Sequence, residues 1–151
     1  MAVQVVSFFD QFPDFDCNPD SPISNEFKRL GKARNWRPGS KTWTKNWNRC
    51  MGNEYNRLIG SRISNLETWQ VMCRKVGLGD EFTSIRQCKK ALSCIYVNII
   101  DLLECWETHE MPTRFCNVSQ LAKYSKKSAK LIPREWAKQD KVLRVLLKRL
   151  L

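Results

Sequence analysis

The sequence has a single histidine, only six glycines and no pair of cysteines separated by two residues. It therefore lacks zinc-finger spacing, the HExxH motif and a glycine-rich phosphate loop, which all need these residues at fixed intervals. His109 lies between Thr108 and Glu110 in a segment that reads as a loop. No nucleophile is marked beside it, as a catalytic set would require. We expect a protein that is not an enzyme, with no metal site and no cofactor.

Long apolar runs are also missing, because no stretch approaches the roughly 20 apolar residues of a membrane-spanning helix. The longest candidate, Ala91 to Trp106, is interrupted by Asn98, Asp101 and Glu104. The N-terminus has no basic residues before its short apolar patch and makes a poor secretory signal. Seven cysteines, an odd number, favour structural thiols in a reducing compartment. We expect an intracellular protein of the nucleus or cytoplasm, not a secreted one, and no membrane span.

Strand-like alternation is absent as well, and apolar residues recur every three or four positions. The longest such pattern covers about 84–107 and is apolar over most of the helix circumference, as in the centre of a bundle. The same spacing predicts shorter helices before it, another from about 118, and a last one from Pro133 to the end. The fold class predicted is all-α: a single-domain bundle of five or six helices around the central 84–107 helix.

The first 23 residues differ from the rest, because four phenylalanines between positions 8 and 15 alternate with aspartates and prolines. This pattern predicts an irregular, aromatic and acidic N-terminal arm over residues 1–23, followed by a basic helical domain over 24–151. We expect the aromatic side chains to pin the arm onto the body of the protein. The alternative is an acidic-aromatic peptide that docks on a partner or on the chain's own basic face.

The net charge of +11 is concentrated in two blocks. Residues 31–62 carry eight bases and one acid, and residues 114–151 carry eleven bases and two acids. The segment between them is nearly neutral. Clustered lysine and arginine without compensating acids indicate a polyanionic partner, because each neutralised phosphate releases condensed counterions. Since zinc-finger, RNP and zipper signatures are missing, we expect a binding module for nucleic acid that uses phosphate contacts rather than base readout.

The candidate polyanion-binding residues are basic positions on the polar faces of the two blocks. In the C-terminal block they are Lys123, Lys126, Lys127, Lys130, Arg134, Lys138 and Lys141, and in the first block they are Arg34, Arg37, Lys41 and Lys45. Trp36 lies beside a Pro-Gly pair and is the candidate for an exposed stacking residue. Trp43 and Trp47 instead fit the apolar stripe of their own helix and are expected in the core.

The sequence also allows other functions. The basic face or the arm could bind an acidic protein, in a regulatory adaptor that could be a homo-oligomer. The amphipathic last helix could attach to an anionic lipid surface if its apolar face were free. Leu66–Val76 followed by Ile85–Trp106 could be a helix-turn-helix, although the second helix is too apolar for a DNA groove. Asp101 and Glu104, three residues apart near Asn98, are expected to form a polar seam rather than a catalytic pair.

Five segments together resemble a group of small basic proteins of filamentous fungi. These segments are Glu26–Leu30, Trp69–Cys73, Ser84–Leu92, Val97–Leu102 and Val142–Leu147. The resemblance covers most of the chain after residue 8. It brings no activity and no functional residues with it, and it implies an intracellular fungal protein rather than a secreted toxin or a viral factor.

Overall fold

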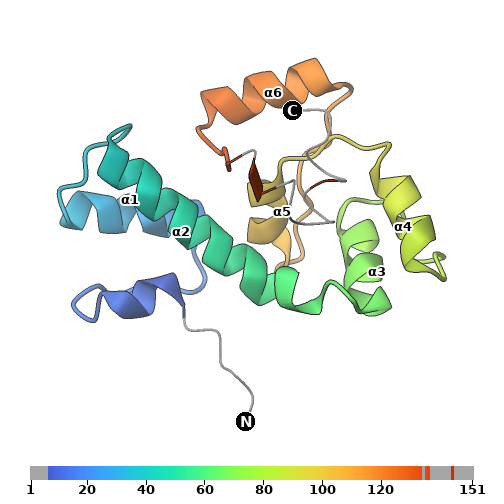
Figure 1. Ribbon diagram of the computed structural model, residues 1–151, viewed down its shortest axis with the longest axis horizontal. Helices are drawn as coiled ribbons and strands as arrows, with labels where there is room; N and C mark the ends of the chain where they lie inside the picture. Colours follow the sequence, from blue (N-terminus) through green and yellow to red (C-terminus); the bar gives the residue numbers. More distant parts are fainter. Residues whose placement is uncertain (1–6, 134, 137–143, 145–151) are drawn as a thin grey trace, which may run out of the picture. The chain divides into compact units, whose positions relative to one another are not determined.

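A computed structural model describes residues 7–133, 135, 136 and 144 and is all-helical, as predicted. The chain divides into two compact units, Met1–Arg57 and Leu58–Leu151. The N-terminal segment thus belongs to the same unit as the first two helices, and the division does not fall at residue 23. The elements in chain order are η1 (Phe8–Gln11), α1 (Ile23–Ala33), α2 (Lys41–Leu58), η2 (Gly60–Arg62), α3 (Leu66–Lys75), α4 (Ile85–Leu92), α5 (Ile99–Cys105) and α6 (Val118–Lys127) (Figure 1).

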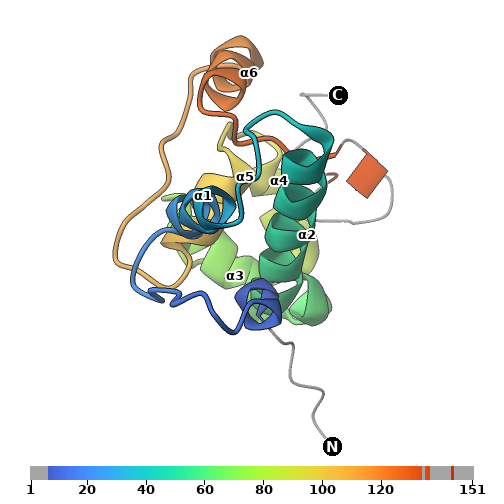
Figure 2. The same cartoon turned by 90° about the vertical axis from the view of Figure 1, so that its left-hand side faces the viewer.

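In the first unit, α1 and α2 are joined by a short turn and cross at an angle, so that α1 is seen end-on in Figure 2 where α2 runs upright (Figures 1 and 2). Gly39, with a φ of 82°, lies in the connecting turn, and the Ser40 hydroxyl caps α2 by accepting from the Trp43 amide at 3.2 Å. Gly31 leaves room for the Trp43 ring, because a Cβ there would lie 2.5 Å from a ring carbon.

The core of the first unit is aromatic. Phe27 is fully buried, with its ring centroid 4.9 Å from that of Trp43 and 5.3 Å from that of Trp47. Phe8 and Phe9 are also buried, within the short 3-10 helix η1. The N-terminal arm is therefore pinned by its phenylalanines, as the sequence predicted.

The predicted continuous helix over 84–107 is wrong, because α4 ends at Leu92 and α5 begins at Ile99. The cause is Asn98, whose Oδ1 accepts from the backbone N–H groups of Ile100 and Asp101 and so starts a new helix. The intervening Val97 is buried without being helical and forms a β-bridge with Arg114. The apolar pattern therefore continues across a break in the backbone.

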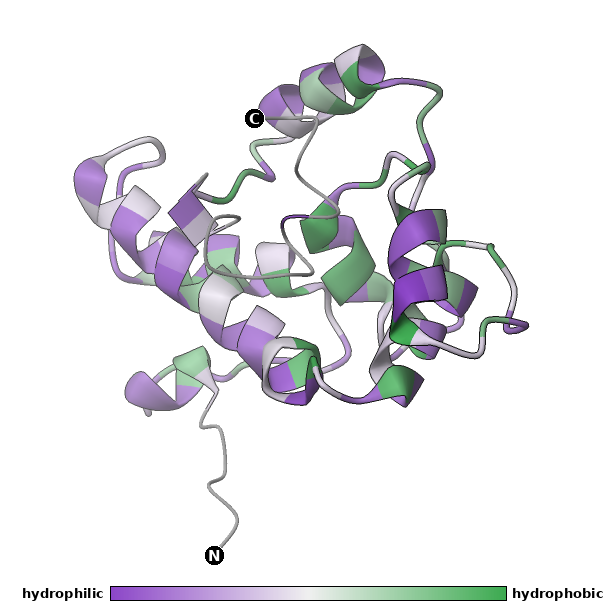
Figure 3. Cartoon of the chain, turned by 45° about the vertical axis from the view of Figure 1, so that its right-hand side comes forward, coloured by the Kyte–Doolittle hydropathy of each residue, from purple (hydrophilic) through white to green (hydrophobic). Residues whose placement is uncertain are grey.

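Hydrophobic residues dominate α5, which lies in the interior of the second unit (Figure 3). Near it, α6 starts where predicted, with the Asn117 Oδ1 accepting from the Gln120 amide at 2.9 Å. Leu121 and Ser125 form the buried side of α6. The helix expected from Pro133 onward lies almost entirely outside the described residues.

Over the residues that the structure describes, no helix is both long enough and apolar enough to cross a membrane.

Candidate nucleic-acid interface

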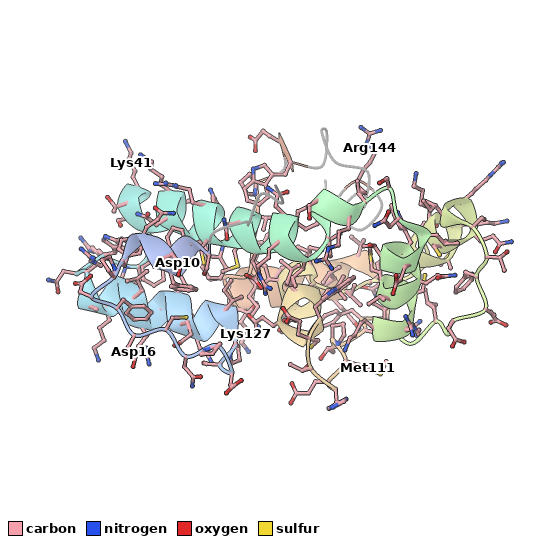
Figure 4. The ribbon with its side chains drawn as sticks, turned by 90° about the horizontal axis from the view of Figure 1, so that it is seen from below. Asp10, Asp16, Lys41, Met111, Lys127 and Arg144 are labelled. Carbon is pink, nitrogen blue, oxygen red and sulfur yellow. The ribbon has the colours of Figure 1, made fainter. Side chains whose placement is uncertain are left out.

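The outward face of α6 carries three lysines and no acid. Lys123, Lys126 and Lys127 are all exposed, and none forms an ion pair with any described residue. At 100° per residue they fall within about 100° of arc on one side of the helix, opposite the buried Leu121. We call these three residues the α6 lysine face, and Lys127 is labelled in Figure 4.

Helix stability explains part of this lysine content but not all of it. Lys126 and Lys127 lie in the last turn of α6, where a cation favours the helix dipole. Lys123 and Lys127 are four residues apart, and like charges at that spacing destabilise a helix by about 0.2–0.5 kcal/mol. An acid at position 123 would therefore suit an ordinary solvated helix better.

Lys130 requires a correction, because it does not belong to the exposed face. Its Nζ lies 2.6 Å from Asp101 Oδ1 and 3.8 Å from Glu104 Oε2, and its side chain is only 18% exposed. The two carboxylates are similarly enclosed, at 11% and 12%. Lys130 is therefore a partner of buried acids on α5 and is not available to a phosphate.

Around Lys130, side chains of α5 and α6 form the polar seam that the sequence predicted. The Tyr124 hydroxyl donates to Asp101 at 2.7 Å, while Asn98 Nδ2 donates to Ser125 Oγ at 3.0 Å and to the Lys130 carbonyl at 2.9 Å. The other oxygen of Glu104, Oε1, is buried and has no hydrogen-bond partner within the part of the chain that the structure describes. These contacts fix α6 against α5.

The polar seam raises the pKa values of two of its groups, Lys130 and Tyr124. Burial lowers the pKa of Lys130, but the hydrogen bond with Asp101 and the charges of Glu104 and Asp101 outweigh burial and raise it. Burial, together with the hydrogen bond to Asp101, raises the pKa of Tyr124. Both groups therefore keep their protons to a higher pH than in the unfolded chain.

In the first unit, three of the predicted binding residues have side chains that are available to a ligand. Arg37, Lys41 and Lys45 are exposed and make no ion pair among the described residues. Lys41 lies in the first turn of α2, where the helix dipole disfavours a cation, and its side chain extends away from the ribbon in Figure 4. Lys45 lies one turn further along the same face. These positions do not serve the stability of α2.

Arg34 and Trp36 differ from the prediction. Arg34 Nη2 forms an ion pair with Asp14 at 2.8 Å, and its guanidinium lies 4.7 Å above the centre of the Phe12 ring. Trp36 is half-buried, with ring centroids 5.7 Å from Phe12 and 6.0 Å from Phe27. Trp36 is thus not an exposed stacking residue, because the N-terminal segment covers it.

The remaining predicted contacts, Arg134, Lys138 and Lys141, lie outside the described residues.

The seven cysteines carry free thiols, three of them buried. Burial is the main cause that raises the pKa of Cys50, and it raises the pKa of Cys73 to about 12, with Cys88 as its neighbour. In the part of the chain that is described, no three His, Cys, Asp or Glu side chains are grouped so that they could hold a metal ion. The buried thiols pack as small apolar groups.

No protein-family model matches this chain, and neither a curated protein nor a solved structure shows significant similarity to it. The resemblance to fungal proteins therefore stays a prediction.

Proposed function

We propose that this protein is a non-enzymatic binding module for a polyanion, namely nucleic acid, and that it contacts phosphates through the α6 lysine face. The observation that carries the proposal is the set of three exposed lysines on α6, without an acidic partner among the described residues. Each lysine that neutralises a phosphate adds affinity by releasing counterions. Arg37, Lys41 and Lys45 support a second contact region on the first unit.

The proposal is tested by fluorescence anisotropy with labelled single-stranded and duplex oligonucleotides at about 50 mM salt. The variant K123Q/K126Q/K127Q removes three charges from the α6 lysine face. The matched control R74Q/R86Q/K90Q removes three charges from other exposed positions of the second unit, on α3 and α4. Both variants lower the net charge equally, so a difference between them reports position rather than total charge.

We expect the α6 variant to bind about 10- to 100-fold more weakly than the wild type, and the control less than about 3-fold more weakly. Equal losses in the two variants would mean that net charge alone attracts the oligonucleotide. Absence of wild-type binding at low salt would refute the proposed function. Glutamine keeps the helix intact, which circular dichroism checks.

A further inference from the structure

Residues 12–16 of the first unit, Phe-Pro-Asp-Phe-Asp, lie on two arginines of α1 and its C-terminal turn. We call this stretch the acidic segment. Phe12 and Asp14 contact Arg34, as described above. Phe15 lies under Arg29, whose guanidinium is 4.8 Å from the ring centre, and Arg29 Nη2 also donates to the Asp16 carbonyl (Figure 4 labels Asp16). The acidic segment thus gives each arginine a ring and an oxygen acceptor, which is a carboxylate only for Arg34, because the ion pair of Arg29 is with Glu26 of α1 at 3.4 Å.

This combination of groups is the one that a nucleotide offers. Single-stranded nucleic acid binds where bases stack on aromatic rings or guanidinium planes and phosphates accept hydrogen bonds from arginine. In the acidic segment, Phe12 takes the position of a base on Arg34, and the Asp14 carboxylate takes that of a phosphate oxygen. The Phe12 ring also covers Trp36, a further aromatic surface.

The ion pair between Asp14 and Arg34 is exposed enough to open. The Asp14 side chain is 74% exposed and that of Arg34 is 38% exposed. Ion pairs this exposed are weak and are screened by salt. Phe8 and Phe9, by contrast, are buried and hold η1 in place. The Asp14 carboxylate can therefore leave Arg34 while Phe12 and Phe15 keep their ring contacts with Phe8 and Phe9.

We propose that Arg29, Arg34 and Trp36 form a binding site for single-stranded nucleic acid, and that the acidic segment occupies this site as an internal competitor. The inference rests on the proposed function and deepens it, since it assigns a further contact site that the chain's own acidic segment covers in the absence of a strand. When a strand binds, its phosphate replaces the Asp14 carboxylate on Arg34. The segment therefore sets how strongly the first unit binds.

The test uses the full chain and a fluorescein-labelled oligo-thymidylate of about 20 nucleotides. Asp14→Asn removes the competing charge. Asp20→Asn is the matched control, because Asp20 is exposed, lies in the same N-terminal region and has no described basic partner. Both substitutions raise the net charge by one, so only loss of the contact with Arg34 separates them.

We expect Asp14→Asn to tighten binding by about two- to fivefold at ~50 mM salt, and Asp20→Asn to leave it nearly unchanged. The double variant D14N/R34Q loses the gain, because the freed guanidinium is then missing.

Equal affinities for Asp14→Asn and Asp20→Asn, with the wild type binding, would overturn the internal competitor and leave the proposed function standing. A gain that persists in D14N/R34Q would overturn it too, as would tighter binding by Asp14→Asn to polyglutamate but not to the oligonucleotide. No binding by any of the variants would refute the proposed function and this inference together.

Discussion

Arg29 and Arg34 of the first unit lie against rings and acceptors of the acidic segment, whereas three lysines on α6 of the second unit extend into solvent. Lys130, a few residues further along the chain, differs from both groups because two carboxylates of α5 enclose it. Basic blocks that look alike in sequence therefore divide into covered, free and buried charges. What decides among these is whether a carboxylate, a carbonyl or a ring from another segment reaches the base.

The largest expected effect on stability comes from removing the enclosed positive charge of Lys130. Lys130→Met leaves Asp101 and Glu104 enclosed without a cation, and breaking such a pair is costly. We expect a loss of about 2–4 kcal/mol of unfolding free energy at pH 7, below the full cost for a wholly buried pair because Lys130 is partly exposed. Urea unfolding followed by tryptophan fluorescence measures it. A loss below about 0.5 kcal/mol, the size of an ordinary surface substitution, would contradict the assignment.

The aromatic core of the first unit is tested by Gly31→Ala. Alanine favours a helix over glycine by up to about 1 kcal/mol, but its Cβ would lie 2.5 Å from the rigid Trp43 ring. The clash outweighs the gain, so we expect destabilisation of about 1–3 kcal/mol. Urea unfolding followed by tryptophan fluorescence measures this loss. A more stable Gly31→Ala variant would show that the two helices are not closely packed there.

Alkaline pH should lower the stability of the fold, because Lys130 loses its proton. A group whose pKa is raised by folding stabilises the fold fully below its unfolded pKa and stops doing so as the pH rises through the folded value. We expect the stability difference between wild type and Lys130→Met to be constant up to about pH 9.5 and to narrow above about pH 10.4. Tyr124 changes wild-type stability in the same direction. A difference that widens above pH 10.4 would contradict the raised pKa.

The smallest expected effect on stability comes from Lys126→Met, the exposed counterpart of Lys130→Met. Because Lys126 has no described ion-pair partner, we expect a change within about 0.5 kcal/mol in the same urea experiment. The same substitution should weaken oligonucleotide binding. A large loss of stability would mean that the α6 lysine face is part of the fold rather than a binding surface.

Local signals in the sequence were sufficient for much of the fold. Helix α6 starts where predicted, and Phe8 and Phe9 pin the N-terminal arm as expected. The break between α4 and α5 was missed because Ile95 and Val97 extend the apolar spacing through a non-helical stretch. Asn98 followed by Asp101 was the available signal, since both residue types favour the first turn of a helix.

The candidate site was less predictable, because the spacing of nearby residues does not show which side chains pair across the fold. The free lysines of α6 were found by charge alone, while the burial of Lys130 depends on acids about 29 residues earlier in the chain. The partial burial of Trp36 likewise depends on Phe12, which is more than 20 residues away in the sequence. The sequence shows that an acidic segment is present, but it does not show which arginine this segment contacts.

The most direct test of the phosphate-binding account is the salt dependence of oligonucleotide affinity for the wild type and K123Q/K126Q/K127Q, between ~50 and ~200 mM salt. The account predicts that the variant's slope of log affinity against log salt is shallower by about 2, because three lysines no longer neutralise phosphates on a single strand. Parallel slopes for the two proteins would contradict it, since the α6 lysine face would then make no phosphate contacts.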